Sequence, residues 1–414
     1  MSITLTDGQQ TAYEKFAKFI LDPYDDVFVL GGYSGTGKST LTKTLLERLP
    51  SIFKTAKLID PKYQDWEIQL TATTNQAADN FSRITGMPVS TIHSFLGLRV
   101  ITDYGSGTSS LVPKDRHDIK HNYLIFIDEA SYIDDKLLKL IFQMTDKCKI
   151  IFMGDPAQLT PVNSTRVPVF TSGFKGAELT KVMRQAEGNP IIELSTKFRE
   201  TVNTGKFFSF TPDNHHIQYK PRDEFNKAIE IEFTDPDWNF LRSKVLAWTN
   251  KAVINYNHVI RDLAKGDPNF HVGDYAVCNK FISAGAYNIK TDQMVLITDI
   301  GPDMEQFGVR GNMFQVDNRY ELFMPKYLSD KKELIRSATI SEDLNILRHV
   351  DTQWIDLRAA YACTINKAQG STYQKVFIDL DDIKKCNSGD QIARMLYVAV
   401  SRASQQVILT GDLV

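Results

Sequence analysis

The sequence predicts an α/β protein with two parallel β-sheets in tandem. Short apolar runs that end in polar residues recur along the chain and alternate with stretches of helical apolar spacing. The first series of runs covers residues 25–30, 68–73, 123–130 and 149–155, and the second covers 244–253, 361–370, 375–380 and 406–412. Because this alternation is typical of parallel sheets, we expect the functional residues at the carboxyl ends of the strands.

Two further stretches differ in character from these series. Residues 97–121 have strand-like flanks around a Gly/Ser tip, which predicts a projecting β-hairpin. Residues 270–350 are rich in short β-like runs, which predicts a small inserted β-barrel. The expected domains are therefore residues 1–173, which include the hairpin, and residues 174–269 with 351–414, which enclose the insertion.

The composition is that of a globular protein without a charge bias. The chain has 414 residues, of which 42% are hydrophobic and 24% are charged, so it is too long for one core. Its formal net charge of −2 gives no global signature of nucleic-acid binding, and any such binding must be local, in a groove.

The cysteines and the apolar segments limit the classes of protein that the chain can belong to. Cys148, Cys278, Cys363 and Cys386 lack metal-ligand spacing, so we expect reduced thiols, with neither zinc nor disulfides. The N-terminus lacks a basic region followed by an apolar run, and no run of 18 uncharged apolar residues occurs. We therefore expect a cytosolic protein without membrane contact.

A glycine-rich segment, GYSGTGKS, follows the first predicted strand and precedes a predicted helix. In such a loop the glycines let backbone N–H groups turn towards phosphate oxygens, and the helix N-terminus adds its positive dipole end. Lys38 would reach the β and γ phosphates of ATP or GTP, and the Ser39 hydroxyl would ligate Mg²⁺. The predicted nucleotide-binding residues are Gly32, Tyr33, Ser34, Gly35, Thr36, Gly37, Lys38, Ser39 and Thr40.

Two acidic residues follow another predicted strand and complete this site. Asp128 would hold Mg²⁺ through water, and Glu129 would orient or deprotonate the attacking water. Asp155 and Gln158 follow a further strand and are candidates for sensing the γ-phosphate. Hydrolysis also needs cations on the developing charge, and Arg184 and Arg402 are the candidates.

With these residues in order, the chain resembles superfamily 1 helicases of the RecD-like branch, most closely a phage member. LTDGQQTAY resembles the family's Q motif, and GYSGTGKS and DEAS resemble motifs I and II. LTATTNQAA and STIHSF look like motifs Ia and Ib, and GDPAQLTPV is similar to motif III. LTKVMRQ, YACTINKAQGST and LYVAVSRA resemble motifs IV, V and VI.

This resemblance implies a fold of two RecA-like domains with a pin hairpin in the first and an SH3-like insertion in the second. It places Gln9 against adenine, which favours ATP, and it makes Arg184 and Arg402 face ATP from the second domain. Gln158 would couple the nucleotide to DNA, and Gln369 and Gly370 would lie near the inter-domain cleft, with Gly370 at the nucleotide.

Small polar residues at strand ends are candidates for a single-stranded DNA track. Such residues are ordinarily helix caps or turn residues, but the resemblance to motifs Ia, Ib and V favours DNA contacts. The candidates are Thr73, Thr74, Asn75, His93, Ser94, Thr249, Asn250, Thr364, Asn366 and Lys367. Asn366 departs from the family, which usually has His there, and Trp248 either stacks on a base or belongs to the core.

The sequence thus predicts an ATP-dependent DNA helicase that uses ATP and Mg²⁺ and acts on single-stranded DNA and its junctions with duplex. The resemblance implies 5′ to 3′ travel, monomeric action, a phage origin and a place among replication or recombination proteins. The hairpin is either a strand-separating pin or an ordinary surface hairpin. Two other readings are an ATP-switched DNA-binding protein and a P-loop phosphotransferase. Glu129 argues against the first, and a second sheet without its own phosphate loop argues against the second.

Overall fold

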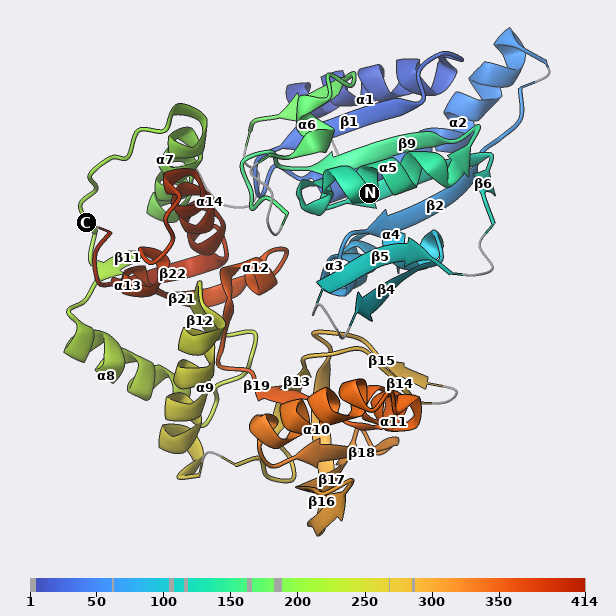
Figure 1. Ribbon diagram of the computed structural model, residues 1–414. Helices are drawn as coiled ribbons and strands as arrows, with labels where there is room; N and C mark the ends of the chain where they lie inside the picture. Colours follow the sequence, from blue (N-terminus) through green and yellow to red (C-terminus); the bar gives the residue numbers. More distant parts are fainter. Residues whose placement is uncertain are drawn as a thin grey trace.

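The computed structural model describes residues 5–61, 63–103, 108–114, 118–161, 166–181, 188–267, 269–284 and 287–413. Two parallel sheets lie side by side, and a separate antiparallel sheet lies beside the second (Figure 1). The predicted pair of parallel sheets is therefore confirmed. In the described part of the chain, no helix has the length and apolar character needed to cross a membrane.

The first sheet has six parallel strands in the order β10-β1-β9-β7-β2-β3. Their bounds are β1 Val27–Gly32, β2 Glu67–Ala72, β3 Ser90–Thr91, β7 Tyr123–Asp128, β9 Lys149–Gly154 and β10 Gly176–Leu179. The edge strand β10 lies beyond residue 173, where the sequence placed the end of the first domain. The first sheet therefore continues to Leu179.

Helices cover both faces of the first sheet, which explains why its strands are almost continuously apolar. One face packs on α1 (Asp7–Leu21), α2 (Lys38–Ile59) and α3 (Asn75–Thr85). The other packs on α4 (Ile92–Phe95), η1 (Ala130–Tyr132), α5 (Asp135–Gln143) and α6 (Pro168–Thr171). Along β7, Phe126 enters the first core and Ile125 and Ile127 enter the second, as the alternation of a strand requires.

The second sheet has five parallel strands in the order β11-β22-β21-β12-β20. Their bounds are β11 Ile217–Tyr219, β12 Ser243–Ala247, β20 Ala362–Thr364, β21 Tyr373–Asp379 and β22 Ala403–Thr410. The helices α7 (Pro190–Thr204) and α14 (Gly389–Val400) cover one face, and α8 (Arg222–Phe233) and α9 (Asn250–Lys265) cover the other. Two short helices follow strand ends, namely α12 (Ile365–Ala368) and α13 (Leu380–Ile383).

The insertion is β-rich, as expected, but it also contains helices that the sequence analysis did not predict. Its antiparallel sheet has the order β18-β17-β16-β13-β19. The bounds are β13 Tyr275–Cys278, β14 Ile282–Ala284, β15 Tyr287–Ile289, β16 Met294–Gln306, β17 Val309–Val316, β18 Tyr320–Pro325, α10 Leu328–Ile340, α11 Leu344–Gln353 and β19 Leu357–Ala359. Because β19 pairs with β13, the sheet also takes in residues beyond the predicted limit at residue 350.

The predicted hairpin is present and shorter than expected. It consists of β4 (Leu98–Asp103) and β5 (Thr108–Pro113), paired antiparallel from Leu98 opposite Pro113 to Asp103 opposite Thr108. Residues 104–107 of its tip lie outside the described residues. The last residues of the predicted segment form β6 (Lys120–His121), which pairs with β8 (Thr145–Asp146) instead.

Candidate nucleotide site and nucleic-acid face

The phosphate loop joins β1, the strand next to the edge strand β10, to α2. Gly35 and Gly37 both have φ of 80°, a left-handed conformation that favours glycine. Gly32 is close to the edge strand, since a Cβ there would lie 2.8 Å from the carbonyl oxygen of Leu179. Lys38 donates from Nζ to the carbonyl oxygens of Gly32 at 2.7 Å and Tyr33 at 3.0 Å. The loop thus has the geometry that a phosphate cradle requires.

A cleft of about 260 Å³ opens beside this loop, and both sheets contribute to its lining. The residues that line it are Ser34, Gly35, Gly37, Lys38, Ser39, Thr40, Asn80, Ile84, Asp128, Glu129, Gln158, Gly370 and Arg402. All but Asn80 and Ile84 of α3 were predicted as site residues. Sequence reasoning missed these two because nothing in a helical interior marks a side chain that faces a neighbouring cleft.

The two acids lie at the end of β7, across the cleft from the loop. The Asp128 carboxylate accepts from the Glu129 backbone N–H at 2.9 Å. Burial, with Glu129 beside it, raises the pKa of Asp128, and the nearby Lys38 ammonium opposes this. Thr73 donates to the Glu129 carbonyl oxygen at 3.1 Å, so it ties the end of β2 to the acids.

The oxygen donors in this cleft fit a magnesium ion. Ser39 is the second residue of α2, and both Ser39 and Asp128 line the cleft. Mg²⁺ prefers hard oxygen ligands and is usually held by one or two protein oxygens together with substrate phosphates and water. A hydroxyl and a carboxylate beside a phosphate loop are such a set.

Gln158 lines the same cleft as the acids, and Gln369 links Gln158 to Glu129. Gln158 follows β9 in the first domain, and Gln369 follows α12 in the second. The Gln369 amide nitrogen lies 2.8 Å from Gln158 Oε1 and 3.0 Å from Glu129 Oε2. A Cβ on Gly370 would lie 3.7 Å from Glu129 Oε1, and the φ of Gly370 is 83°. Gln369 and Gly370 therefore both lie beside Glu129 between the domains, which is where the family resemblance placed them.

Arg402 reaches the loop from the second domain. It is 2% exposed, and its Nη2 donates to the Ser34 hydroxyl at 3.1 Å, while its Nη1 donates to the Ser371 carbonyl oxygen at 2.9 Å. The other predicted arginine, Arg184, lies outside the described residues. Gln9 caps α1 with Thr6 and donates to the Thr36 carbonyl oxygen at 3.4 Å, so it touches the back of the loop.

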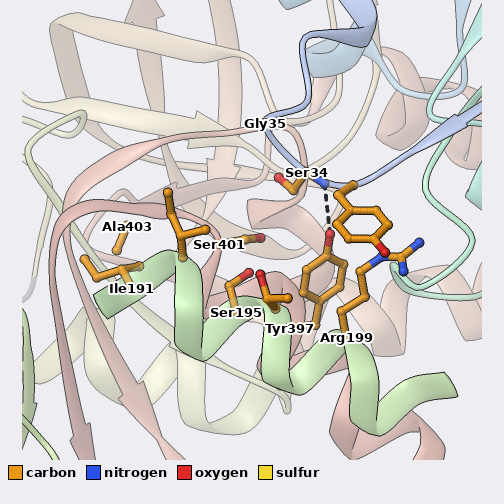
Figure 2. A pocket seen from close by; sticks show the side chains of 11 residues that line it. Ser34, Gly35, Ile191, Ser195, Arg199, Tyr397, Ser401 and Ala403 are labelled. Atoms are coloured by element: carbon orange, nitrogen blue, oxygen red, sulfur yellow. Dashed lines mark hydrogen bonds between the residues drawn. The ribbon is translucent and has the colours of Figure 1, made fainter. Parts of the chain in front are cut away.

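A second contact between the domains lies next to the cleft (Figure 2). Tyr397 of α14 points at the loop, where its hydroxyl accepts from the Ser34 backbone N–H at 2.9 Å and donates to Asp155. Arg199 of α7 pairs with Asp155 at 3.4 Å and stacks on the Tyr33 ring, with 3.5 Å between Cζ and the ring centroid. Sequence reasoning missed Tyr397 and Arg199 because a tyrosine in an apolar helix and an arginine in an amphipathic one carry no signal.

The segment after β9 is held mainly by the second domain. Ala157 and Leu159 belong to the hydrophobic core beneath α7 and α14. Arg394 of α14 donates to the carbonyl oxygens of Pro156 and Gln158, each at 2.7 Å. Gln158 is therefore positioned by both domains, and a relative movement of the domains must move it.

Comparison with known proteins agrees with this arrangement. The AAA domain family model matches residues 4–221, and the model of the UvrD-like helicase C-terminal domain matches residues 359–410. The ATP-dependent DNA helicase dda of Enterobacteria phage T4 is 27% identical, with 97% of this chain and 98% of that protein covered. The chain belongs to the Pif1/Dda/RecD-like superfamily 1 helicases.

Other members of this helicase family show the same relationship. The ATP-dependent DNA helicase Pif1 of Bdellovibrio bacteriovorus is 24% identical over 91% of this chain and 82% of that protein. The crystal structure of a Bacteroides Pif1 helicase in complex with ADP-AlF3 and single-stranded DNA has a TM-score of 0.52 at 18% identity. It covers 100% of this chain and 94% of that chain, and it confirms the fold with two RecA-like domains.

The threonines predicted to contact DNA in this helicase are helix caps. Thr74, Thr249 and Thr364 precede α3, α9 and α12, and each side chain accepts from a backbone N–H of its helix. The Thr249 hydroxyl also donates to Asp382 at 2.8 Å, so an acidic group lies at this position. The capping role therefore holds for all three side chains, and a DNA role would be additional to it.

The remaining predicted DNA residues of the helicase differ in what they contact. Burial lowers the pKa of His93, which therefore favours the neutral form. Lys367 donates to Asn279 at 2.9 Å and to Asp292 at 2.6 Å, so it is bonded to the insertion. The Asn366 carbonyl oxygen accepts from the Tyr132 hydroxyl at 2.8 Å. Ser94 is exposed within α4, Asn250 is exposed at the start of α9, and Asn75 is half-buried at the start of α3.

Of the two roles that the sequence left open for Trp248, the structure shows the one in the hydrophobic core. It is half-buried and packs against the core beneath α7 and α14, and its backbone N–H donates to Asp382. It contributes apolar area to the second domain.

Proposed function

We propose that this chain is an ATP-dependent DNA helicase that hydrolyses ATP between its two RecA-like domains and travels 5′ to 3′ along single-stranded DNA. The observation that carries this proposal is the shared cleft. The phosphate loop and both acids come from the first domain, whereas Arg402 and Gly370 come from the second. Hydrolysis in such a site depends on domain closure, which is what a translocating motor requires.

Each residue of the cleft has a role that its chemistry supports. Lys38 leaves its carbonyl partners to bind the β and γ phosphates, and the backbone N–H groups from Gly35 to Thr40 orient them. Ser39 and Asp128 would hold Mg²⁺, which supplies charge neutralisation at the phosphates. Glu129 accepts the proton of the attacking water.

The second domain supplies the remaining groups. Arg402, which bonds to the Ser34 hydroxyl of the phosphate loop, would stabilise the charge that develops on the transferred phosphoryl group, and Arg184 is the second arginine we assign to this task. Gln158 reports the state of the γ-phosphate to both domains because its backbone is held by α14. Gln9 orients the adenine side of the loop through Thr36.

The DNA track follows from the strand ends of both domains. We propose that Thr73, Thr74, Asn75, His93 and Ser94 on the first domain and Thr249, Asn250, Thr364, Asn366 and Lys367 on the second hold the strand. Closure on ATP and reopening after hydrolysis would shift the grip by about one nucleotide per cycle. The family's members support DNA as the track, since the related T4 and Bdellovibrio proteins are named ATP-dependent DNA helicases.

We propose action on junctions of single-stranded and duplex DNA by a monomer from a phage, with replication or recombination proteins as partners. A related solved structure, of two coordinating Pif1 helicases, is titled for unwinding at forked double-stranded DNA, with a TM-score of 0.50. For this chain, sedimentation with and without a forked duplex would separate one copy from two.

The decisive experiment measures ATP hydrolysis with and without single-stranded DNA, and unwinding of duplexes with 5′ or 3′ tails. We expect strong stimulation and unwinding from 5′ tails only. The Lys38→Ala variant should bind DNA but not hydrolyse ATP. Hydrolysis that ignores DNA would instead support a switch or a phosphotransferase, and unwinding from 3′ tails alone would defeat the direction.

The hairpin of β4 and β5 is the proposed strand-separating pin. Deleting residues 105–110 should abolish unwinding and leave DNA-stimulated hydrolysis unchanged, because the wedge acts on duplex and not on the track. A deletion variant that unwinds at the wild-type rate would remove this role.

A further inference from the structure

We propose that Gln369 is a positioning residue that connects the DNA-contacting helix α12 to the hydrolytic Glu129, so that DNA binding reaches the site of hydrolysis through one amide group. This inference rests on the proposed function. It adds a route of coupling that neither the phosphate loop nor Arg402 provides, because both act on the nucleotide alone.

The contacts of Gln369 are unusually concentrated on the hydrolytic groups. The residue is 5% exposed, and its Nε2 lies within 3.2 Å of three acceptors, which are Gln158 Oε1, Glu129 Oε2 and Ser131 Oγ. An amide nitrogen has only two hydrogens, so the three acceptors share them. One side chain of the second domain therefore holds both the catalytic acid and the candidate γ-phosphate sensor of the first.

The orientation of the amide is fixed by its neighbours. Turning it over would point Oε1 at the Glu129 carboxylate and at Gln158 Oε1, both of which are acceptors. In the orientation present, Oε1 is buried and has no hydrogen-bond partner in the described part of the chain. A buried acceptor without a partner costs free energy, so this atom is suited to a donor that arrives with the reaction, such as the attacking water.

The position of Gln369 in the chain gives the coupling its direction. It directly follows α12, whose cap is Thr364 and whose cation is the partly exposed Lys367. Tyr132, which lies just after the catalytic acids in the chain, donates from its hydroxyl to the Asn366 carbonyl oxygen of the same short helix. Because α12 is a single short turn with Gln369 as its C-cap, a DNA phosphate that shifts α12 through Lys367 also shifts the Gln369 backbone relative to Glu129.

The chemical effect follows from the hydrogen bond to Glu129. An N–H donated to a carboxylate oxygen fixes the direction of the carboxylate, and a group that takes a proton from water must point at that water. When α12 shifts, this bond lengthens or shortens, and the rate of hydrolysis changes with it. Misplacement of a catalytic group by about 1 Å lowers rates by about 10²-fold.

The test is the Gln369→Met variant of the full chain, which keeps side-chain volume and removes the amide. With saturating single-stranded DNA we expect kcat for ATP to fall by about 30–100-fold. KM for ATP and Kd for a fluorescent oligonucleotide should stay within about twofold, because neither ligand loses a direct contact. The stimulation by DNA should shrink with kcat.

A second variant distinguishes positioning from a structural role. If Gln369 acts through Glu129, then Glu129→Gln combined with Gln369→Met should be no slower than Glu129→Gln alone. If the kcat losses of the two single variants multiply in the double variant, then Gln369 acts independently of Glu129, and the proposal is overturned.

Gln391 offers a matched control. Like Gln369, it lies on the second domain and bonds across to the segment after β9, with 2.6 Å from its Nε2 to the Thr160 hydroxyl, but it does not contact Glu129. Gln391→Met should lower the melting temperature as Gln369→Met does and keep kcat within about twofold. A wild-type protein without DNA stimulation would refute the proposed function, whereas a stimulated wild type with an unimpaired Gln369→Met variant would refute this inference alone.

Discussion

The two parallel sheets are built alike, but the chemistry at their strand ends differs. In the first sheet, β1 is followed by a glycine-rich loop and β7 by two carboxylates. In the second, β12 and β20 are followed by capped helices, and the cleft residues Gly370 and Arg402 lie just after α12 and α14. In the proposed function the first sheet thus binds the nucleotide, and the second supplies groups that act only when the domains meet.

The same contrast separates the two contacts across the domain boundary. Gln369 and Arg402 reach Glu129 and Ser34, which we propose act on the nucleotide. Tyr397 and Arg199 reach Asp155 and the outer side of the loop, next to the cleft. We therefore expect the first contact to set the rate of hydrolysis and the second to set how firmly the domains hold together.

The largest effect should come from Arg402→Ala. Arginines supplied to a phosphoryl transfer site are worth about 10³–10⁵ in kcat, so we expect a loss of at least about 10³-fold with little change in nucleotide affinity. Steady-state ATPase and binding of a fluorescent nucleotide would measure the two. Arg222→Ala is the control, since Arg222 pairs with Asp379 and Asp381 within the second domain. A loss in kcat of less than tenfold would mean that Arg184 alone stabilises the transferred phosphoryl group.

The next effect tests the structural contact. Tyr397→Phe removes one hydroxyl that bonds to Ser34 and Asp155, and leaving such groups unpaired costs about 1–3 kcal/mol. We expect a melting temperature lower by a few degrees and kcat within about threefold. The matched variant Tyr256→Phe loses a bond to Asp379 inside the second domain. A bound ATP analogue should change the loss in melting temperature of Tyr397→Phe but not that of Tyr256→Phe. If the two variants lose the same amount with and without the analogue, Tyr397 does not act as a contact between the domains.

What the sequence could predict was local. The loop from Gly32 to Ser39 and the pair Asp128 and Glu129 each follow a strand directly, so pattern and chemistry coincide. Arg402 was predicted through its motif. Tyr397 and Arg199 were not, because their partners lie far away in the chain and only the packing of α14 and α7 brings them to Asp155.

The insertion shows the same limit for secondary structure. Its strand-like runs were recognised, but α10 and α11 were not, because their apolar residues are few and several, such as Ile340 and Leu344, are exposed. The short edge strand β10 was missed for another reason. A strand of four residues is recognisable only through its pairing with β1.

A smaller effect is expected at Lys367, on the proposed DNA face of the second domain. Lys367→Ala should weaken binding of single-stranded DNA by about three- to tenfold and reduce the slope of log affinity against log salt by about one, as for the loss of one phosphate contact. Anisotropy titrations at several salt concentrations would measure both. An unchanged slope would mean that Lys367 serves only to hold the insertion through Asn279 and Asp292.

The smallest effect is a gain in DNA affinity, which we expect when Asp292, the ion-pair partner of Lys367, loses its charge. Asp292 holds Lys367 at 2.6 Å, with both side chains about one-third exposed, so the carboxylate competes with a phosphate for the same cation. Asp292 has a φ of 64°, a left-handed conformation that asparagine adopts at least as readily, so Asp292→Asn should not strain the backbone. Exposed ion pairs are worth about 0.2–1 kcal/mol, so we expect DNA affinity to rise by about two- to threefold at low salt and to converge with wild type at high salt. Asp303→Asn, which removes the same charge from the distant pair with Lys326, should leave affinity unchanged. If both variants tighten binding equally, net charge is responsible, and Asp292 does not compete with DNA for Lys367.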